Sequence, residues 1–234
     1  MTMKVRFRFA KVGRVRWTSH RDVARMWERA LRRGRLPVSY TGGFSPRPQL
    51  SFGLALPTGC ESVAEYVDAA FDAELDAAEL PARLDPHLPD GVSVMAAAPL
   101  ADRAPSLQEE VTSCSWDIDV SGVPLDVLQA ALERALGAAA LPVHRERKGR
   151  RTVDDLRPSV LSLHAATADA AGSRLHAELA TRPRGVRPAE LAEALGLELG
   201  LARRTCQWIE RSGSRREPLA ASVASPDPVL GRAS

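Results

Sequence analysis

The sequence predicts an α+β protein made of two tandem ferredoxin-like units, each a split β-α-β arrangement with an antiparallel sheet. Strand-type and helix-type periodicities alternate along the chain, and the same order of segments recurs in its second half. The chain has 234 residues, which is enough for two units of about 100 residues each.

The predicted boundaries follow changes in composition. The first unit spans 1–99 and contains a G-F-S-P-R-P loop, and a polar linker covers 100–112. The second unit spans 113–211. Residues 212–234 are rich in Ser, Ala, Pro and Arg without periodicity, which predicts a disordered tail.

The first predicted element is a strand with a basic outer face. Val5, Phe7 and Phe9 alternate with Arg6 and Arg8, which is the period of two that a half-buried strand requires. After Gly13 interrupts this pattern, the chain leads into a helix.

A basic amphipathic helix is predicted over 20–33, where apolar residues recur at helical spacing. Ser19 is suited to the N-cap, Asp22 can complete a capping box, and Gly34 follows the last turn. The face opposite the apolar stripe carries arginines, namely Arg21, Arg25, Arg29, Arg32 and Arg33.

The remaining elements are predicted from the same two periods. In the first unit they are a strand at 65–71, a helix at 73–84 and a strand at 91–97. In the second unit they are strands at 115–120, 159–168, 173–180 and 204–209, helices opening at Pro124 and Pro188, and a basic hairpin tip at 145–151.

Composition excludes several classes of protein. No apolar run approaches the roughly 18 residues of a membrane span, and the N-terminus has no secretory signal, so we expect a cytoplasmic protein without membrane contact. Cys60, Cys114 and Cys206 lie far apart, without the spacing of a disulfide framework, a zinc site or an iron–sulfur site. We therefore expect no metal and no cofactor.

Charge is distributed unevenly along the chain, although its net value is only +3. Residues 1–50 carry 13 Lys and Arg against 2 Asp and Glu, whereas residues 51–113 carry 2 against 12. The two segments can neutralise each other inside the fold, or the basic segment can form an open face that attracts polyanions.

The stretch 39–65 contains the most unusual local sequence. Pro46 and Pro48 restrict the backbone on both sides of Arg47, so its guanidinium is expected to be presented by a rigid loop and to suit a phosphate or carboxylate. The alternative is an ordinary long loop that packs Phe44 and Phe52 into the core.

Candidate catalytic groups are few. His20 begins the basic helix and can act as a general acid or base, or it simply packs at the helix start. The chain has no nucleophile elbow, no P-loop, no H-E-x-x-H motif and no dinucleotide-binding G-x-G-x-x-G. The basic hairpin tip, with Lys148, Arg150 and Arg151, either grips phosphates or is merely solvated.

The stretch from W-T-S-H-R-D through G-G-F-S-P-R-P to S-F-G-L-A-L-P-T-G resembles the radical SAM-linked proteins of unknown function. The resemblance is specific over residues 4–70 and departs at Arg21, where the family has leucine. It implies an association with a cobalamin-binding radical SAM protein, in the neighbourhood of a ribonuclease and ribosomal proteins. A fainter likeness, in topology alone, is to the endoribonucleases that process CRISPR repeats.

These observations predict an RNA- or ribosome-associated accessory protein of a radical SAM enzyme. The residues expected to bind RNA are Arg21, Arg25, Arg29, Tyr40, Phe44, Arg47, Lys148, Arg150 and Arg151. One alternative is a metal-independent endoribonuclease with His20 as general base. Another is a protein adaptor, without RNA contact, whose acidic segment 51–113 docks a basic partner.

Overall fold

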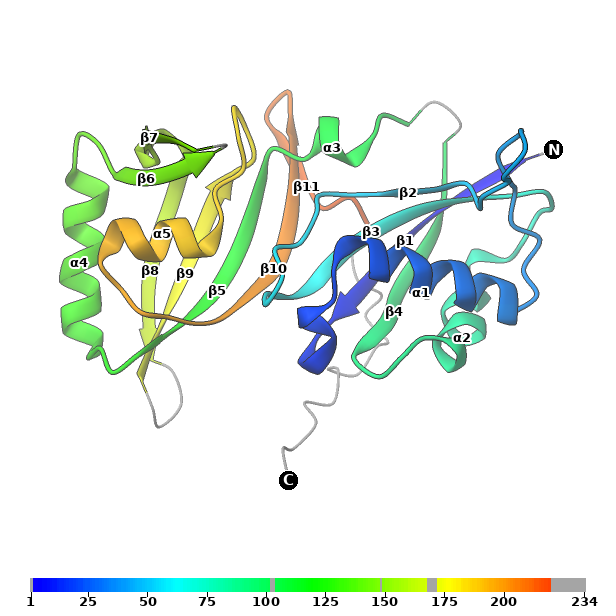
Figure 1. Cartoon of the computed structure of the whole chain (residues 1–234), viewed down its shortest axis with the longest axis horizontal. Helices are drawn as coiled ribbons and strands as arrows, with labels where there is room; N and C mark the ends of the chain where they lie inside the picture. Colours follow the sequence, from blue (N-terminus) through cyan, green and yellow to red (C-terminus); the bar gives the residue numbers. More distant parts are fainter. Residues whose placement is uncertain (1, 102–103, 148, 168–171, 220–234) are drawn as a thin grey trace. The chain divides into compact units, whose positions relative to one another are not determined.

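The computed structural model describes residues 2–101, 104–147, 149–167 and 172–219 (Figure 1). The chain forms two compact units. Unit 1 comprises the residues up to Glu110 and those from Glu217 onward, and unit 2 runs from Val111 to Arg216. The strand pairs within each unit are antiparallel, which confirms the α+β class.

Unit 1 contains a sheet in the order β4 (Val92–Leu100), β1 (Met3–Lys11), β3 (Glu61–Phe71) and β2 (Leu50–Phe52). Between β1 and β2 lie η1 (Gly13–Trp17) and α1 (His20–Arg33). Between β3 and β4 lie η2 (Ala77–Glu79), α2 (Leu80–Leu84) and η3 (Asp85–His87), and α3 (Leu107–Glu110) follows β4.

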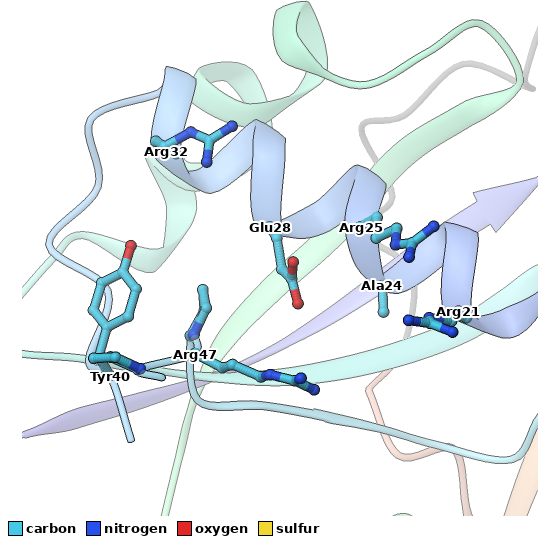
Figure 2. Close-up of a pocket in the computed structure, with 9 residues that line it drawn as sticks. Arg21, Ala24, Arg25, Glu28, Arg32, Tyr40 and Arg47 are labelled. Carbon is cyan, nitrogen blue, oxygen red and sulfur yellow. The ribbon is translucent and has the colours of Figure 1, made fainter. Parts of the chain in front are cut away.

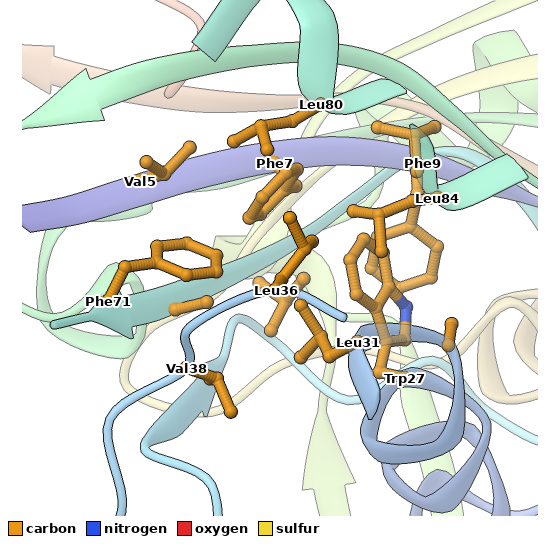
Figure 3. Packing of buried hydrophobic residues seen from close by; sticks show 14 of the residues in the cluster. Val5, Phe7, Phe9, Trp27, Leu31, Leu36, Val38, Phe71, Leu80 and Leu84 are labelled. Carbon is orange, nitrogen blue, oxygen red and sulfur yellow. The ribbon is translucent and has the colours of Figure 1, made fainter. Parts of the chain in front are cut away.

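The core of unit 1 is built around Trp27 of α1 (Figure 3). Its ring centroid lies 5.3 Å from that of Phe7 and 5.1 Å from that of Phe9. Phe7 also meets Phe71 of β3 edge to face, at 6.4 Å. The apolar side of the predicted first strand is therefore confirmed as the side that faces the core.

The predicted basic outer face of this strand is wrong. Arg6 and Arg8 point to the other side of the sheet, as expected, but they are only 4% and 5% exposed. Arg6 forms an ion pair with Asp68, and Arg8 forms one with Glu217. A buried guanidinium needs a carboxylate beside it, and here one partner comes from the acidic segment and the other from beyond unit 2.

Helix α1 has the predicted bounds and the predicted N-terminal cap. The Ser19 hydroxyl accepts a hydrogen bond from the Asp22 backbone N–H at 3.2 Å, and the Asp22 carboxylate accepts one from the Ser19 backbone N–H at 3.3 Å. Gly34 is the C-cap, but its φ is −70°, and the left-handed conformation falls on Arg35 instead.

The predicted helix over 73–84 is shorter in the structure. Asp76 caps a single 3-10 turn by accepting a hydrogen bond from the Ala78 backbone N–H at 2.9 Å, and α2 starts only at Leu80. Pro81 lies in the first turn of α2, where proline is tolerated, and Pro86 lies two positions beyond its last residue, in η3. The prolines thus divide the segment into η2, α2 and η3.

Unit 2 contains a sheet in the order β10 (Leu199–Arg211), β5 (Ser113–Ser121), β9 (Gly172–Ala180) and β8 (Val160–Thr167), with β11 (Ser214–Arg216) beside β10. The helices are α4 (Leu125–Gly137) and α5 (Pro188–Leu195). A separate hairpin, β6 (Pro142–Arg147) and β7 (Arg150–Asp155), and then η4 (Arg157–Ser159) lie between α4 and β8.

The two units share one order of strands. When the four main strands of each unit are numbered along the chain, both sheets run fourth, first, third, second. In each unit a helix follows the first strand and another follows the third. The hairpin β6–β7 has no counterpart among the described elements of unit 1.

The predicted disordered tail, 212–234, includes residues that are ordered in the structure. Ser214–Arg216 pair with β10 as β11, and Leu219 accepts a hydrogen bond from the Tyr66 hydroxyl at 3.2 Å. The remainder of the predicted tail, 220–234, lies outside the described residues. The predicted linker holds α3, whose Leu107 is buried.

No helix among the described residues is long and apolar enough to cross a membrane. Cys60, Cys114 and Cys206 form no disulfide in the described part of the chain. Within the same ranges, His, Cys, Asp and Glu side chains form no group of three or more that could hold a metal ion.

Candidate functional site

An open groove of about 460 Å³ lies in unit 1 between α1 and the loop 40–48 (Figure 2). From α1 it is lined by Arg21, Ala24, Arg25, Glu28 and Arg32, and from the loop by Tyr40, Pro46, Arg47 and Pro48. Four of these nine residues are arginines.

Helical spacing brings the α1 residues together. Arg21, Arg25, Glu28 and Arg32 are separated by four, three and four positions, so they share one face of the helix. A different face, which includes Trp27, is buried in the core. The helix is therefore fixed by its apolar stripe while its charged stripe stays open.

Hydrogen bonds across the loop 40–48 hold Arg47 opposite this face. The Thr41 backbone N–H donates to the Arg47 carbonyl at 2.8 Å, and the Arg47 backbone N–H donates to the Thr41 hydroxyl at 3.1 Å. At the base, the backbone N–H of Gln49 donates to the Ser39 carbonyl at 2.8 Å. The Arg47 side chain extends along the groove toward Arg21 (Figure 2).

Most of the groove's charge is not neutralised by the protein. Arg21, Arg32 and Arg47 form no ion pair within the described residues. Arg25 lies 3.7 Å from Asp22, with both side chains about half exposed. Exposed pairs of this kind contribute little, about 0–1 kcal/mol, so Arg25 can exchange Asp22 for another anion.

Two acidic residues belong to this helix face or border it. Hydrogen bonds from the side chain and backbone of Ser19 hold the pKa of Asp22 below its ordinary value, so this carboxylate stays ionised at neutral pH. Glu28 points from α1 into the groove, toward the segment that carries Arg47 (Figure 2). The side chains lining the groove thus carry four positive charges and one negative.

The basic segment is consequently divided into two sets of arginines. Arg6 and Arg8 are buried in ion pairs, and Arg16 lies 3.7 Å from Glu61. The acidic segment therefore neutralises part of the strand and of η1. It leaves the α1 and loop arginines available to a ligand.

Of the residues predicted to bind RNA, the groove unites Arg21, Arg25, Tyr40 and Arg47. Arg29 is exposed on α1 but does not line the groove. Phe44 is fully exposed in the loop, so the alternative that packs Phe44 into the core is wrong. Phe52 does pack partly against the core.

The predicted residues of the basic hairpin belong to unit 2. Arg151 is exposed on β7. Lys148 lies outside the described residues, and so does the side chain of Arg150. The hairpin thus contributes one described side chain to the predicted set.

His20 lies apart from the groove lining. Its ring meets Phe52 edge to face, with centroids 5.2 Å apart, and it borders a small cavity of about 20 Å³ whose lining includes Phe9 and Val23. The geometry fits the reading in which His20 packs at the helix start.

Two residues of the groove lining, Arg32 and Glu28, were not among the residues predicted to bind RNA. Trp17, in the turn before α1, is 64% exposed and was not predicted as a site residue either. The spacing of four, three and four from Arg21 was a signal for the first two. No local pattern in the sequence showed that Trp17 is exposed.

A sequence model of a bacterial family, described as an uncharacterized protein conserved in bacteria (DUF2344), matches residues 4–188. The chain belongs to this family. The groove lies wholly within the region of the DUF2344 match. No curated protein matches the chain.

Among solved structures, this DUF2344 chain is similar to a chain of the "Crystal Structure of a Cbf5-Nop10-Gar1 Complex", with a TM-score of 0.47 and 9% sequence identity. The similarity covers 87% of this chain and 48% of that chain. The DUF2344 chain therefore spans about half the length of the chain it matches.

Proposed function

We propose that this protein is an RNA-binding accessory protein, and that RNA phosphates bind in the groove between α1 and the loop 40–48. The observation that carries this proposal is the set of four arginines around one open groove, three of which have no ion pair among the described residues. An RNA backbone supplies regularly spaced anions, which such a row of cations attracts.

Arginine suits this role better than lysine. Its planar guanidinium donates to a phosphate in a bidentate manner and stays charged at every physiological pH. Arg47, which lies between Pro46 and Pro48 in a loop closed by hydrogen bonds, has little backbone freedom left to lose on binding.

RNA binding through this groove predicts a defined salt dependence. Four neutralised phosphates on a single strand give a slope of roughly −3 in log K against log salt concentration. Filter retention of cellular RNA at about 50 mM and about 200 mM salt should therefore show a loss of affinity of about 50-fold.

Substitution of the groove arginines tests whether RNA binds in the groove. The triple variant Arg21→Ala/Arg25→Ala/Arg47→Ala should bind RNA at least about tenfold more weakly and with a shallower slope. The matched control Arg33→Ala/Arg83→Ala/Arg134→Ala removes the same charge from exposed helical positions outside the groove. Absence of RNA binding at low salt, or equal loss in both triple variants, would overturn the proposal.

We further propose that the protein presents its RNA to a separate radical SAM enzyme in the cytoplasm, with a ribonuclease or a ribosomal particle as further partners. The resemblance over residues 4–70 supports this association. Co-purification from a nuclease-treated lysate separates the cases: retention of the enzyme indicates direct contact, and its loss indicates a bridge made by RNA.

The same assays distinguish the alternatives. RNA cleavage that persists with a chelator and disappears in His20→Ala would favour a metal-independent endoribonuclease. Retention of the radical SAM enzyme without any affinity for RNA would favour a protein adaptor. Neither alternative has an observation in its favour comparable with the arginine groove.

We also propose that both units are ferredoxin-like folds, with the hairpin β6–β7 inserted in the second. The shared strand order of fourth, first, third, second supports this, since it is the order of the split β-α-β arrangement. An experimental structure in which either unit has another strand order would contradict it.

A further inference from the structure

We infer that the ligand of the groove is single-stranded RNA, whose unpaired bases stack on Trp17 and Tyr40. This inference rests on the proposed function and specifies its substrate. Within the described residues, the exposed aromatic side chains are Trp17, Tyr40 and Phe44, at 64%, 49% and 110% exposure. They lie in the loop that forms the groove or in the turn that leads into α1.

The coincidence of aromatic and cationic residues is informative because aromatic residues are scarce in this chain, at 5% of the sequence. The other Phe, Tyr and Trp side chains of the described residues are buried or partly buried. Sites for single-stranded nucleic acid combine a positive groove for the backbone with aromatic faces for the bases.

The indole of Trp17 is exposed to solvent and packs against Gly59. The Gly59 backbone N–H donates to the Arg16 carbonyl at 2.9 Å, which brings Gly59 against the indole. A Cβ on Gly59 would lie 2.9 Å from Cζ3 of Trp17, so the ring rests on the bare glycine backbone. The indole also lies beside the Arg16 guanidinium, whose Cζ is 5.2 Å from the ring centroid. These two contacts restrict the ring before a ligand arrives, which limits the entropy lost when a base stacks on it.

The separation of the groove arginines also indicates the length of RNA that the groove can bind. Arg21 and Arg32 are eleven residues apart on α1, or about 16 Å along the helix axis, which about five stacked nucleotides would span. Tyr40 lies at the Arg32 end of the groove (Figure 2). Trp17 ends η1, which precedes α1, and lies four residues before Arg21 in the sequence.

Stacking on both rings requires bases that are free of a duplex. In an A-form helix the bases are paired and stacked on each other, so a duplex offers mainly phosphates and ribose hydroxyls. A duplex could still bind the arginines, but it would leave the two aromatic rings in solvent. The expected preference is therefore for single strands.

The test compares one RNA sequence of about ten nucleotides as a single strand and as a duplex, using the full-length protein and its variants. The single strand should bind more tightly, and it should quench the tryptophan fluorescence of the wild-type protein but not of Trp17→Phe. Trp17→Ala and Tyr40→Ala should each lose about 5- to 100-fold in affinity for the single strand and little for the duplex.

Val127→Ala is the control, because it truncates an exposed apolar side chain in unit 2. Circular dichroism verifies folding, and Trp17→Phe serves if Trp17→Ala does not fold, with quenching as its readout. Equal binding of duplex and single strand, or unchanged single-strand affinity in both alanine variants, overturns this inference and leaves the arginine groove standing. If neither RNA binds, the proposed function fails as well.

Discussion

Arg6 and Asp68 form a bidentate ion pair between neighbouring strands, with 2.7 Å from Nε to Oδ1 and 2.8 Å from Nη2 to Oδ2. The Arg6 side chain is 5% exposed and the Asp68 side chain 15%. This pair shows that part of the basic N-terminal segment stabilises the fold. Only the cationic side chains outside such buried ion pairs are available to bind a ligand.

Removing one partner of this pair should be costly. Asp68→Ala leaves a buried guanidinium without its carboxylate, and we expect a loss of about 3–5 kcal/mol in the free energy of unfolding, measured by urea denaturation. Arg25→Ala, which breaks the exposed pair with Asp22, should cost about 0–1 kcal/mol. Similar costs for the two variants would contradict the structural role of Arg6.

Glu28→Gln should strengthen RNA binding. Glu28 is the one acidic residue in the groove lining, and its carboxylate would repel phosphates bound as proposed at Arg25 and Arg47. Filter binding should show an affinity gain of about three- to fivefold at low ionic strength, which shrinks as salt screens the charge. Glu133→Gln, on the exposed face of α4, is the matched control.

Gly59→Ala should both destabilise the protein and displace Trp17. The backbone of Gly59 has a φ of +90°, and the added Cβ would meet the indole at 2.9 Å. We expect a loss of about 1–3 kcal/mol in thermal unfolding and a shift in tryptophan emission. Gly137→Ala, where a Cβ meets nothing within 4 Å, should have neither effect.

Glu190 of α5 should make unit 2 sensitive to acid. Burial alone would raise the pKa of Glu190, but hydrogen bonds from the Arg187 backbone and from Arg184, with the charges of Arg184 and Arg145, outweigh burial and lower it. A depressed pKa stabilises the folded state at pH values above the unfolded value of 4.5.

That stabilisation is lost as the pH falls through the folded pKa of Glu190. Denaturant unfolding should therefore show Glu190→Gln to be less stable than wild type at pH 7, by at most about 1 kcal/mol for a partly exposed group. The difference should vanish in acid well below the unfolded pKa of about 4.5. A difference that persists there would exclude the carboxylate charge as its cause.

Local signals were sufficient to predict some elements. Helix α1 could be predicted at both ends because Ser19, Asp22 and the apolar stripe all act within a few residues of each other. The alternation of Phe7 and Phe9 with arginines likewise predicted β1 and the side that faces the core.

Long-range contacts could not be predicted from local patterns in the sequence. Asp68 is 62 residues from Arg6, and Glu217 is 209 residues from Arg8, so no local pattern shows that these arginines are buried. The contact of Trp17 with Gly59 similarly joins residues more than forty positions apart. Four residues of the groove lining were predicted from the sequence, namely Arg21, Arg25, Tyr40 and Arg47. That they lie around one groove depends on the hydrogen bonds within the loop 40–48.

The ion pair of Arg8 with Glu217 also affects how the nascent chain matures. Nη1 of Arg8 donates to both oxygens of Glu217, at 2.9 and 3.0 Å, so the first unit to emerge during translation needs a residue that emerges after the whole second unit. A fragment ending at Glu110 therefore lacks the carboxylate that pairs with Arg8 in the full chain. Unit 1 reaches its final state only after synthesis has passed Glu217.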